Sequence, residues 1–281
     1  MATSATRSVD RTVRVKGLPL HYLEWGAKEK PAVIMIHGLS GNAHNFDRLA
    51  PYFVSKYHVI SVDVRGRGDS GWAKDGDYST GAYVSDMEGL VAALGLQRFS
   101  LIGTSMGGRI SMAYAGTHPG NVEKIVLNDI GPEVDTRGGQ RISTYMREAP
   151  ERFKDMAEVV AYYRANYPFL KGLNDAEMRE YAGYMVKPHP EGGFVWKLDP
   201  AIRQDPRRPD IAQAWSWAKA ITAPILLLRG AISDVLSPEV AQRMVRELHS
   251  CRMVPVPGVG HAPTLSEPEA LNAIKEFFGL K

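Results

Sequence analysis

Short apolar runs alternate along the chain with longer segments of helical character. The apolar runs lie at residues 32–36, 58–63, 98–102, 122–128, 225–230 and 252–257, and segments of helical character include 80–94, 109–117 and 267–278. An opening hairpin is expected at 12–15 and 20–25, around the turn Gly17-Leu18-Pro19. Because strands that alternate with helices usually pair in parallel, we predict an α/β protein with a mostly parallel central sheet and helices on both faces.

The alternation stops between residues 131 and 217. Segments of helical character at 141–147, 155–165, 175–185 and 211–220 follow one another with no strand pattern between them. We therefore predict a core formed by residues 1–130 and 218–281, with a helical lid at 131–217 that covers the pocket and sets substrate selectivity. The lid is rich in aromatic residues: Tyr145, Tyr162, Tyr163, Tyr167, Phe169, Tyr181, Tyr184, Phe194, Trp196, Trp215 and Trp217.

The segment Leu101-Ile102-Gly103-Thr104-Ser105-Met106-Gly107-Gly108 joins an apolar strand to a helix through a serine flanked by glycines. A serine on so sharp a turn needs neighbours without side chains, so that the strand and the helix can approach each other. Ser105 is therefore predicted to be a nucleophile. The backbone N–H of Met106, at the start of the helix, is predicted to stabilise a developing oxyanion. A glycine-rich helix cap with a capping serine is the alternative interpretation.

A histidine and an acid follow two later strands. His261 lies in a glycine-lined turn after the strand at 252–257, and Asp234 lies after the strand at 225–230, just before a helix that begins at Ser237-Pro238. Asp129, directly after the strand at 122–128, is a second candidate, and either carboxylate has the reach to orient His261. We favour Asp234, because the Gly-x-x-x-Asp approach and the capped helix after it match the usual acid loop. Asp129 then fixes the start of the lid.

The order Ser105, Asp234, His261 resembles that of the α/β-hydrolase fold superfamily, in particular its small single-domain serine hydrolases with a Gly-x-Ser-Met-Gly-Gly elbow. The resemblance covers nearly the whole chain. It includes the loop His37-Gly38-Leu39-Ser40-Gly41 and the turn Asp63-Val64-Arg65-Gly66-Arg67-Gly68-Asp69-Ser70. The resemblance implies that the Leu39 N–H is the second oxyanion donor, that His37 shapes the oxyanion loop, and that Asp63 and Asp69 are structural.

The resemblance implies a serine hydrolase that cleaves a carboxylic ester or lactone of a small apolar or aromatic substrate through an acyl-enzyme on Ser105, with no cofactor. The aromatic lid fits such a pocket, although packing of the lid on the core explains the same residues. Candidate substrate contacts are His37, Tyr145, Trp196 and Arg203. Arg137, Arg141 and Arg203 are candidates for binding a substrate carboxylate, against the simpler interpretation that each is a solvated surface arginine.

Three other functions stay open. A hydrolase of carbon–carbon bonds in aromatic ring-cleavage products uses similar machinery, but such enzymes usually have an asparagine before the serine and a longer glycine-rich oxyanion loop, where this chain has Thr104 and Leu39-Ser40-Gly41. A cofactor-free peroxidase needs no further residue. A ligand receptor on the same fold is the non-enzymatic alternative. Haloalkane dehalogenases and epoxide hydrolases are excluded, because both use an aspartate at the elbow.

Composition narrows the remaining possibilities. The 281 residues are 44% hydrophobic, enough for one α/β domain with a large core or a core with an inserted cap. The net charge of +3 and a short basic cluster, Arg207-Arg208 near Arg203, give no nucleic-acid signature. The single cysteine, Cys251, a polar start and the lack of a long apolar run predict a cytoplasmic enzyme without a membrane span. Metal-binding motifs are missing, so no metal is expected, and the sequence leaves a homodimer open.

Overall fold

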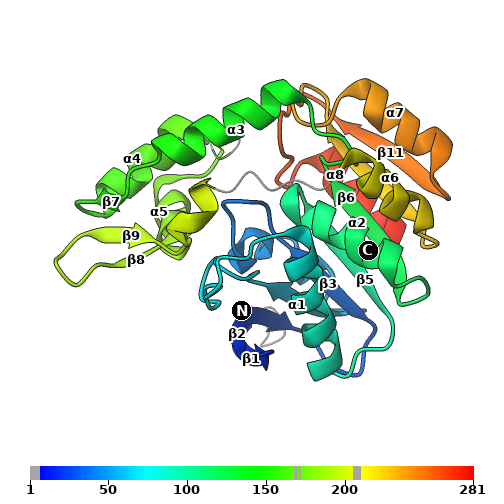
Figure 1. The fold of residues 1–281 in the computed structure, drawn as a ribbon, viewed down its shortest axis with the longest axis horizontal. Coiled ribbons are helices and arrows are strands. Elements are labelled where there is room, and N and C mark those ends of the chain that lie inside the picture. Colours follow the sequence, from blue (N-terminus) through cyan, green and yellow to red (C-terminus); the bar gives the residue numbers. More distant parts are fainter. Residues whose placement is uncertain (1–6, 168–169, 171, 205–209) are drawn as a thin grey trace.

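The computed structural model describes residues 7–167, 170, 172–204 and 210–281 (Figure 1). Its centre is an eight-stranded sheet with the strand order β1-β2-β4-β3-β5-β6-β10-β11. The strands are β1 (Val9–Val15), β2 (Leu18–Trp25), β3 (Ala32–Ile36), β4 (His58–Val62), β5 (Phe99–Thr104), β6 (Val122–Asn128), β10 (Ile225–Gly230) and β11 (Cys251–Val256). The β1–β2 hairpin and the β2–β4 pair are antiparallel, and all other pairs are parallel. The predicted α/β fold with a mostly parallel sheet is confirmed.

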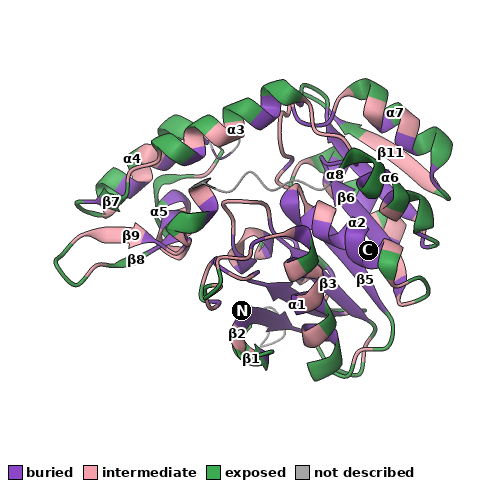
Figure 2. Ribbon diagram, in the orientation of Figure 1, coloured by how far each residue is buried: buried purple, intermediate pink, exposed green. Residues whose placement is uncertain are grey.

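Helices cover both faces of this sheet. The core cluster on one face combines sheet residues with α1 (Thr80–Ala93), α2 (Met106–Thr117), α6 (Ile211–Ala220) and α7 (Pro238–Glu247). The cluster on the other face contains α8 (Pro268–Phe278) and the short turns η2 (Ala43–Phe46) and η3 (Ala50–Tyr52). The central strands are buried on both sides, as Figure 2 shows, which explains their continuous apolar sequence. This burial fixes the strand ends that carry the site.

The inserted segment forms an arm that projects from the core in Figure 1. It contains α3 (Thr136–Glu148), α4 (Met156–Asn166), α5 (Asp175–Met185), η5 (Pro200–Gln204) and a small antiparallel sheet in the order β7-β9-β8. The strands are β7 (Arg152–Phe153), β8 (Val186–Pro188) and β9 (Phe194–Trp196). Three predicted helices are present, but a purely helical lid is not. Strands of two or three residues are too short to show a sequence period, which is why the prediction missed them.

The predicted end of the lid at residue 217 falls inside α6, which packs on α2 of the core. A Cβ atom on Gly116 of α2 would lie 2.3 Å from the backbone oxygen of Trp217, so the two helices touch at a glycine. The helix at 211–220 therefore lies with the core.

Two predictions concern residues outside those described: the lid aromatic Phe169 and the basic pair Arg207-Arg208. Among the described residues, none of the helices has the length and apolar character that a membrane crossing requires.

Candidate active site

Ser105 lies between the end of β5 and the start of α2, in a conformation with φ of 51° and ψ of −114°. The left-handed φ costs a residue with a side chain, and the surrounding packing must hold it. A Cβ atom on Gly103 would lie 2.4 Å from the oxygen of Gly107, and one on Gly107 would lie 2.0 Å from the oxygen of Ile36. Both flanking positions must therefore be glycine, as the motif predicted.

A continuous hydrogen-bond chain starts at this serine. The Oγ of Ser105 lies 2.8 Å from Nε2 of His261, and Nδ1 of His261 lies 2.8 Å from Oδ2 of Asp129. The Asp129 carboxylate is fully buried, and the side chain of His261 is 8% exposed. This is the arrangement in which a histidine accepts the proton of a serine while a carboxylate fixes its tautomer.

Asp129 receives two further hydrogen bonds. The backbone N–H of Gly230 donates to Oδ1 at 2.8 Å, and the hydroxyl of Ser233 donates to Oδ2 at 2.6 Å. Asp129 itself has a left-handed φ of 55°, and its N–H donates to the oxygen of Leu228 at 2.8 Å. Because neighbouring strand ends and the loop after β10 all bind it, this carboxylate is locked in place.

Asp234 does not lie against His261, which corrects the preference for it from sequence. Its two oxygens accept from Arg141 on α3, at 2.6 Å from Nε and 2.8 Å from Nη2. That guanidinium lowers the pKa of Asp234 below its usual value. The residue of the loop after β10 that reaches the site is Ser233, whose hydroxyl donates to Asp129, and not Asp234. Sequence reasoning missed Ser233, whose only signal was its position beside the expected acid.

The loop that is predicted to supply the second oxyanion donor follows β3. The ring of His37 is fully buried: its Nδ1 lies 2.7 Å from the oxygen of Gly38, and the N–H of Val64 donates to its Nε2 at 3.2 Å. Burial lowers the pKa of His37 to about 4, so the ring is neutral and Nδ1 carries the proton. Because C=O and N–H point in opposite directions in a trans peptide, the bond to Gly38 also fixes the direction of the Leu39 N–H.

Ser105 and His261 open into a cleft of about 600 Å³ between the core and the arm. Leu39 and His37 line the cleft beside the serine. Met106 is the first residue of α2, where an N–H has no partner within the helix. The arm contributes Ile142, Tyr145, Tyr167, Leu170, Leu173, Tyr181 and Tyr184. The arm also contributes Glu177 and Glu180, so its side of the cleft combines apolar, phenolic and acidic side chains.

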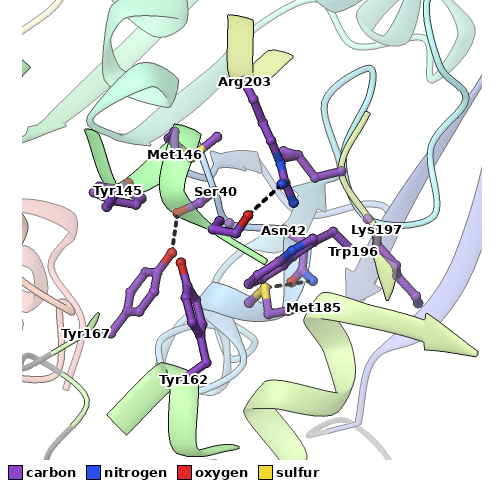
Figure 3. A pocket seen from close by; sticks show the side chains of 14 residues that line it. Ser40, Asn42, Tyr145, Met146, Tyr162, Tyr167, Met185, Trp196, Lys197 and Arg203 are labelled. Atoms are coloured by element: carbon purple, nitrogen blue, oxygen red, sulfur yellow. Dashed lines mark hydrogen bonds between the residues drawn. The ribbon is translucent and has the colours of Figure 1, made fainter. Parts of the chain in front are cut away.

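Of the predicted substrate contacts, His37 and Tyr145 line this cleft, but Trp196 and Arg203 line a second, narrow pocket (Figure 3). The two spaces share Ser40, Gly41, Tyr145 and Tyr167 as walls. The narrow pocket, of about 20 Å³, therefore lies next to the cleft across these shared walls, and we call it the inner pocket.

The other side of the cleft is closed where α5 meets the η2 turn. The rings of His44 and Tyr184 stack with centroids 3.5 Å apart, and Asn45 Nδ2 donates to the hydroxyl of Tyr181 at 3.1 Å. Arg48 and Glu177 form an ion pair at 2.5 Å. Polar and aromatic contacts hold the arm to the core here.

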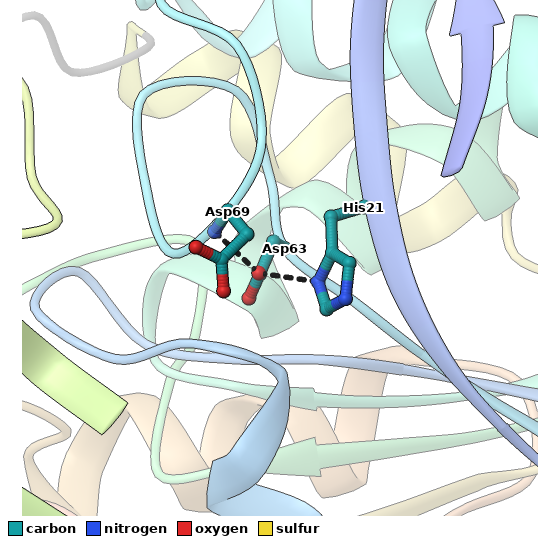
Figure 4. A group of neighbouring side chains, drawn as sticks. All are labelled: His21, Asp63 and Asp69. Carbon is teal, nitrogen blue, oxygen red and sulfur yellow. Dashed lines mark hydrogen bonds and ion pairs between the residues drawn. The ribbon is translucent and has the colours of Figure 1, made fainter. Parts of the chain in front are cut away.

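One group of described side chains, His21, Asp63 and Asp69, is close enough together to hold a metal ion (Figure 4). Hydrogen bonds already use its ligand atoms. His21 Nδ1 lies 2.8 Å from Asp63 Oδ2, and Asp63 also accepts from the N–H groups of Ala43 at 2.6 Å and Asp69 at 2.8 Å. Asp69 forms an ion pair with Lys197 at 2.7 Å. These contacts tie the turn after β4 to its neighbours, so we assign the group a structural role.

Residues 31–268 match the family model described as alpha/beta hydrolase fold, so the chain belongs to that family. A 3-hydroxybutyrate-oligomer hydrolase of Cupriavidus necator is 36% identical over 92% of each chain. A 2-(acetamidomethylene)succinate hydrolase of Mesorhizobium japonicum is 28% identical over 96% of this chain and 95% of its own. The crystal structure of an alpha/beta hydrolase from Novosphingobium aromaticivorans superposes with a TM-score of 0.86 and 32% identity, covering 97% of this chain and 98% of that one. The protein is accordingly a hydrolase of this fold.

Proposed function

We propose that the protein is a serine hydrolase that cleaves carboxylic esters or lactones through an acyl-enzyme on Ser105. The hydrogen-bond chain from Ser105 through His261 to Asp129 carries this proposal, because its atoms and distances suit proton transfer. His261 takes the serine proton as Oγ attacks the ester carbonyl, then gives it to the departing alcohol. Water, activated by the same ring, attacks the acyl carbon, releases the acid and restores the serine.

The negative charge of the tetrahedral intermediates falls on the former carbonyl oxygen. The N–H groups of Leu39 and Met106 are proposed to hold it, each contributing about 3 kcal/mol of barrier lowering. The Asp129 carboxylate accepts a hydrogen bond from Nδ1 of His261, which fixes the tautomer of the ring and stabilises the imidazolium that forms after attack. A bound metal or cofactor has no part in the scheme.

One relative and the charges around the two pockets favour an ester substrate that also carries a carboxylate. Oligomers of a hydroxy acid, which the relative from Cupriavidus necator hydrolyses, are joined by ester bonds and end in a free carboxylate. In this chain, Arg203 and Lys197 line the inner pocket and no described acid lines it, although Lys197 is already paired with Asp69. The outer cleft is lined by Asp47, Glu177, Glu180 and Glu267 with Arg48. A substrate carboxylate is repelled at the outer end and attracted at the inner one.

Arg203 is the residue best placed to receive that carboxylate. Its Nη1 and Nη2 donate to the oxygens of Ala149 at 3.0 Å and Pro150 at 3.3 Å, which hold the guanidinium at the pocket, and its Nε is buried without a hydrogen-bond partner. Burial lowers the pKa of Arg203, and the charge of Glu151 offsets only part of this effect. We therefore propose that the substrate is an ester that also carries a free carboxylate, and that Tyr145 and Trp196 flank it.

A panel of esters and lactones tests the proposed function. The wild type is expected to turn over p-nitrophenyl esters many times and to be labelled by a fluorophosphonate at Ser105, whereas Ser105→Ala loses several orders of magnitude of turnover and all labelling. Ring-cleavage diketone acids and peroxide belong in the same panel. Turnover of esters by Ser105→Ala at the wild-type rate contradicts the proposal. Labelling without multiple turnover identifies a receptor instead of an enzyme.

A further inference from the structure

Arg67 is the largest fully buried side chain among the described residues, with 1% of its surface exposed. It lies in the turn after β4. A buried guanidinium is usually neutralised by a carboxylate, because removing a charge from water is costly. Arg67 takes part in none of the ion pairs formed by the described residues. On one side it donates to the oxygen of Arg65 at 3.0 Å and to the hydroxyl of Tyr83, between the rings of Tyr78 and Tyr83.

The rest of the guanidinium faces the two halves of the proposed oxyanion hole. Nε of Arg67 donates to the backbone oxygen of Leu39 at 3.2 Å, and Nη2 lies 3.3 Å from the sulfur of Met106. Leu39 belongs to the loop after β3, and Met106 begins α2. One rigid, planar group thus touches both residues whose N–H groups are proposed to hold the oxyanion.

The charge of Arg67 also acts on this loop. Together with burial, it lowers the pKa of His37, the ring that orients the peptide between Gly38 and Leu39. Arg67 forms no ion pair with a described carboxylate, although the buried Asp63 acts on His37 in the opposite direction. Because the site is buried and Arg67 touches Leu39 and Met106, its positive potential reaches the place where negative charge develops during attack on the ester.

We propose that Arg67 is a positioning residue for ester hydrolysis: it holds the Leu39 loop against the start of α2 and supplies positive charge behind the oxyanion hole. The inference rests on the proposed function, since it concerns the same oxyanion. It goes beyond that function in assigning a role to a residue that lies behind the site and does not line the cleft.

Arg65 offers a matched control in the same turn. It is also largely buried, but its guanidinium forms a bidentate pair with Asp86 at 2.5 and 2.6 Å, so that its charge is neutralised. Its side chain donates hydrogen bonds to Asp86 and to the backbone oxygen of Asp77, and to neither Leu39 nor Met106. Replacing Arg65 by methionine therefore disturbs the turn and the stability of the fold without removing a charge that acts on the oxyanion hole.

The experiment compares Arg67→Met, Arg67→Lys and Arg65→Met with the wild type. For each, kcat and KM are measured with p-nitrophenyl butyrate, Ki with a trifluoromethyl ketone that forms a tetrahedral adduct on the serine, and Tm by calorimetry. We expect Arg67→Met to lower kcat by about 10- to 100-fold with KM changed by less than about two-fold, and to raise Ki by the factor by which kcat/KM falls. Arg67→Lys keeps the positive charge but loses the planar set of donors of the guanidinium, so we expect a smaller fall in kcat, about three- to ten-fold. Arg65→Met is expected to lower Tm and leave kcat within about two-fold.

A kcat for Arg67→Met within about two-fold of the wild type overturns the inference. So does an equal loss of kcat in Arg65→Met at an equal loss of Tm, because that result shows a general effect of stability. If Arg67→Met does not fold, the test rests on Arg67→Lys. A loss of kcat beyond about two-fold in this variant, with unchanged KM, supports the inference, and a smaller loss of kcat overturns it. The proposed function is tested separately, by whether the wild type turns over the ester and Ser105→Ala does not. A failure of the proposed function can therefore be told apart from a failure of the inference about Arg67.

Discussion

The core and the arm that meet over Ser105 are held by different kinds of contact. In the core, Asp129 and His37 are completely buried. The N–H of Gly230 at the end of β10 donates to Asp129, and the N–H of Val64 after β4 donates to His37. The arm meets the core partly through half-exposed ion pairs, Arg48 with Glu177 and Arg141 with Asp234. Buried hydrogen-bonded groups are costly to disturb, whereas exposed ion pairs contribute little. The fold therefore fixes the buried groups around Ser105, while the contacts of the arm tolerate change.

The two acids give the sharpest test of this comparison. Asp129→Asn is expected to lower kcat by about 10³- to 10⁴-fold, because an amide at that position favours the wrong tautomer of His261. Asp234→Asn removes only an exposed ion pair and should change kcat by less than about three-fold. Steady-state kinetics on a p-nitrophenyl ester measures both. A larger loss in Asp234→Asn would reverse the assignment of the acid.

A second test concerns the buried ring of His37, whose pKa of about 4 lies below the value of 6.5 expected in the unfolded chain. Because the unfolded chain binds the proton more tightly, the contribution of His37 to stability is present above pH 6.5 and is lost as the pH falls towards 4. The whole shift corresponds to about 3 kcal/mol. Urea unfolding of the wild type and of His37→Asn at pH 7 and pH 4.5 should show a steeper loss for the wild type. Equal losses would mean that other groups produce the pH dependence.

A third test addresses the inner pocket. We expect Arg203→Met to lower kcat/KM for p-nitrophenyl hemisuccinate by about 10- to 100-fold, the range of a hydrogen bond to a charged group, and to leave its neutral methyl ester within about two-fold. Arg137→Met is the control, since Arg137 is an exposed arginine of the arm that pairs with Asp135. Parallel losses on both esters would show that Arg203 supports the arm and does not bind a carboxylate.

Much of the core could be predicted from the sequence, because its signals are local. Continuous apolar runs marked the parallel strands, and the steric needs of the elbow marked Ser105 through its glycines. The turn after β11 identified His261. In each case the sequence pattern itself spans about ten residues or fewer, even where the contact that requires it is distant in sequence, as between Gly107 and Ile36.

Which acid pairs with His261 could not be predicted in this way. Asp129 and Asp234 both follow strands, and the choice between them depends on which side chain the loop after β10 turns towards the histidine. In the structure that loop directs Ser233 inward to Asp129, while Asp234 meets Arg141 from α3. These contacts join residues about one hundred positions apart in sequence, for which a single sequence holds no local signal. The buried position of Arg67 was not predicted for the same reason, whereas the small sheet of the arm was missed because its strands are too short to show a sequence period.

The smallest expected effect comes from the ion pair between Arg48 and Glu177, whose side chains are 54% and 40% exposed. A double-mutant cycle with Arg48→Ala and Glu177→Ala should give a coupling of less than about 1 kcal/mol in unfolding, because solvent screens the charges and both side chains lose entropy in pairing. The coupling should fall further at 1 M salt. If it instead exceeded about 2 kcal/mol and persisted in salt, the arm would be fastened as firmly as the core, and selectivity would have to come from a rigid cleft.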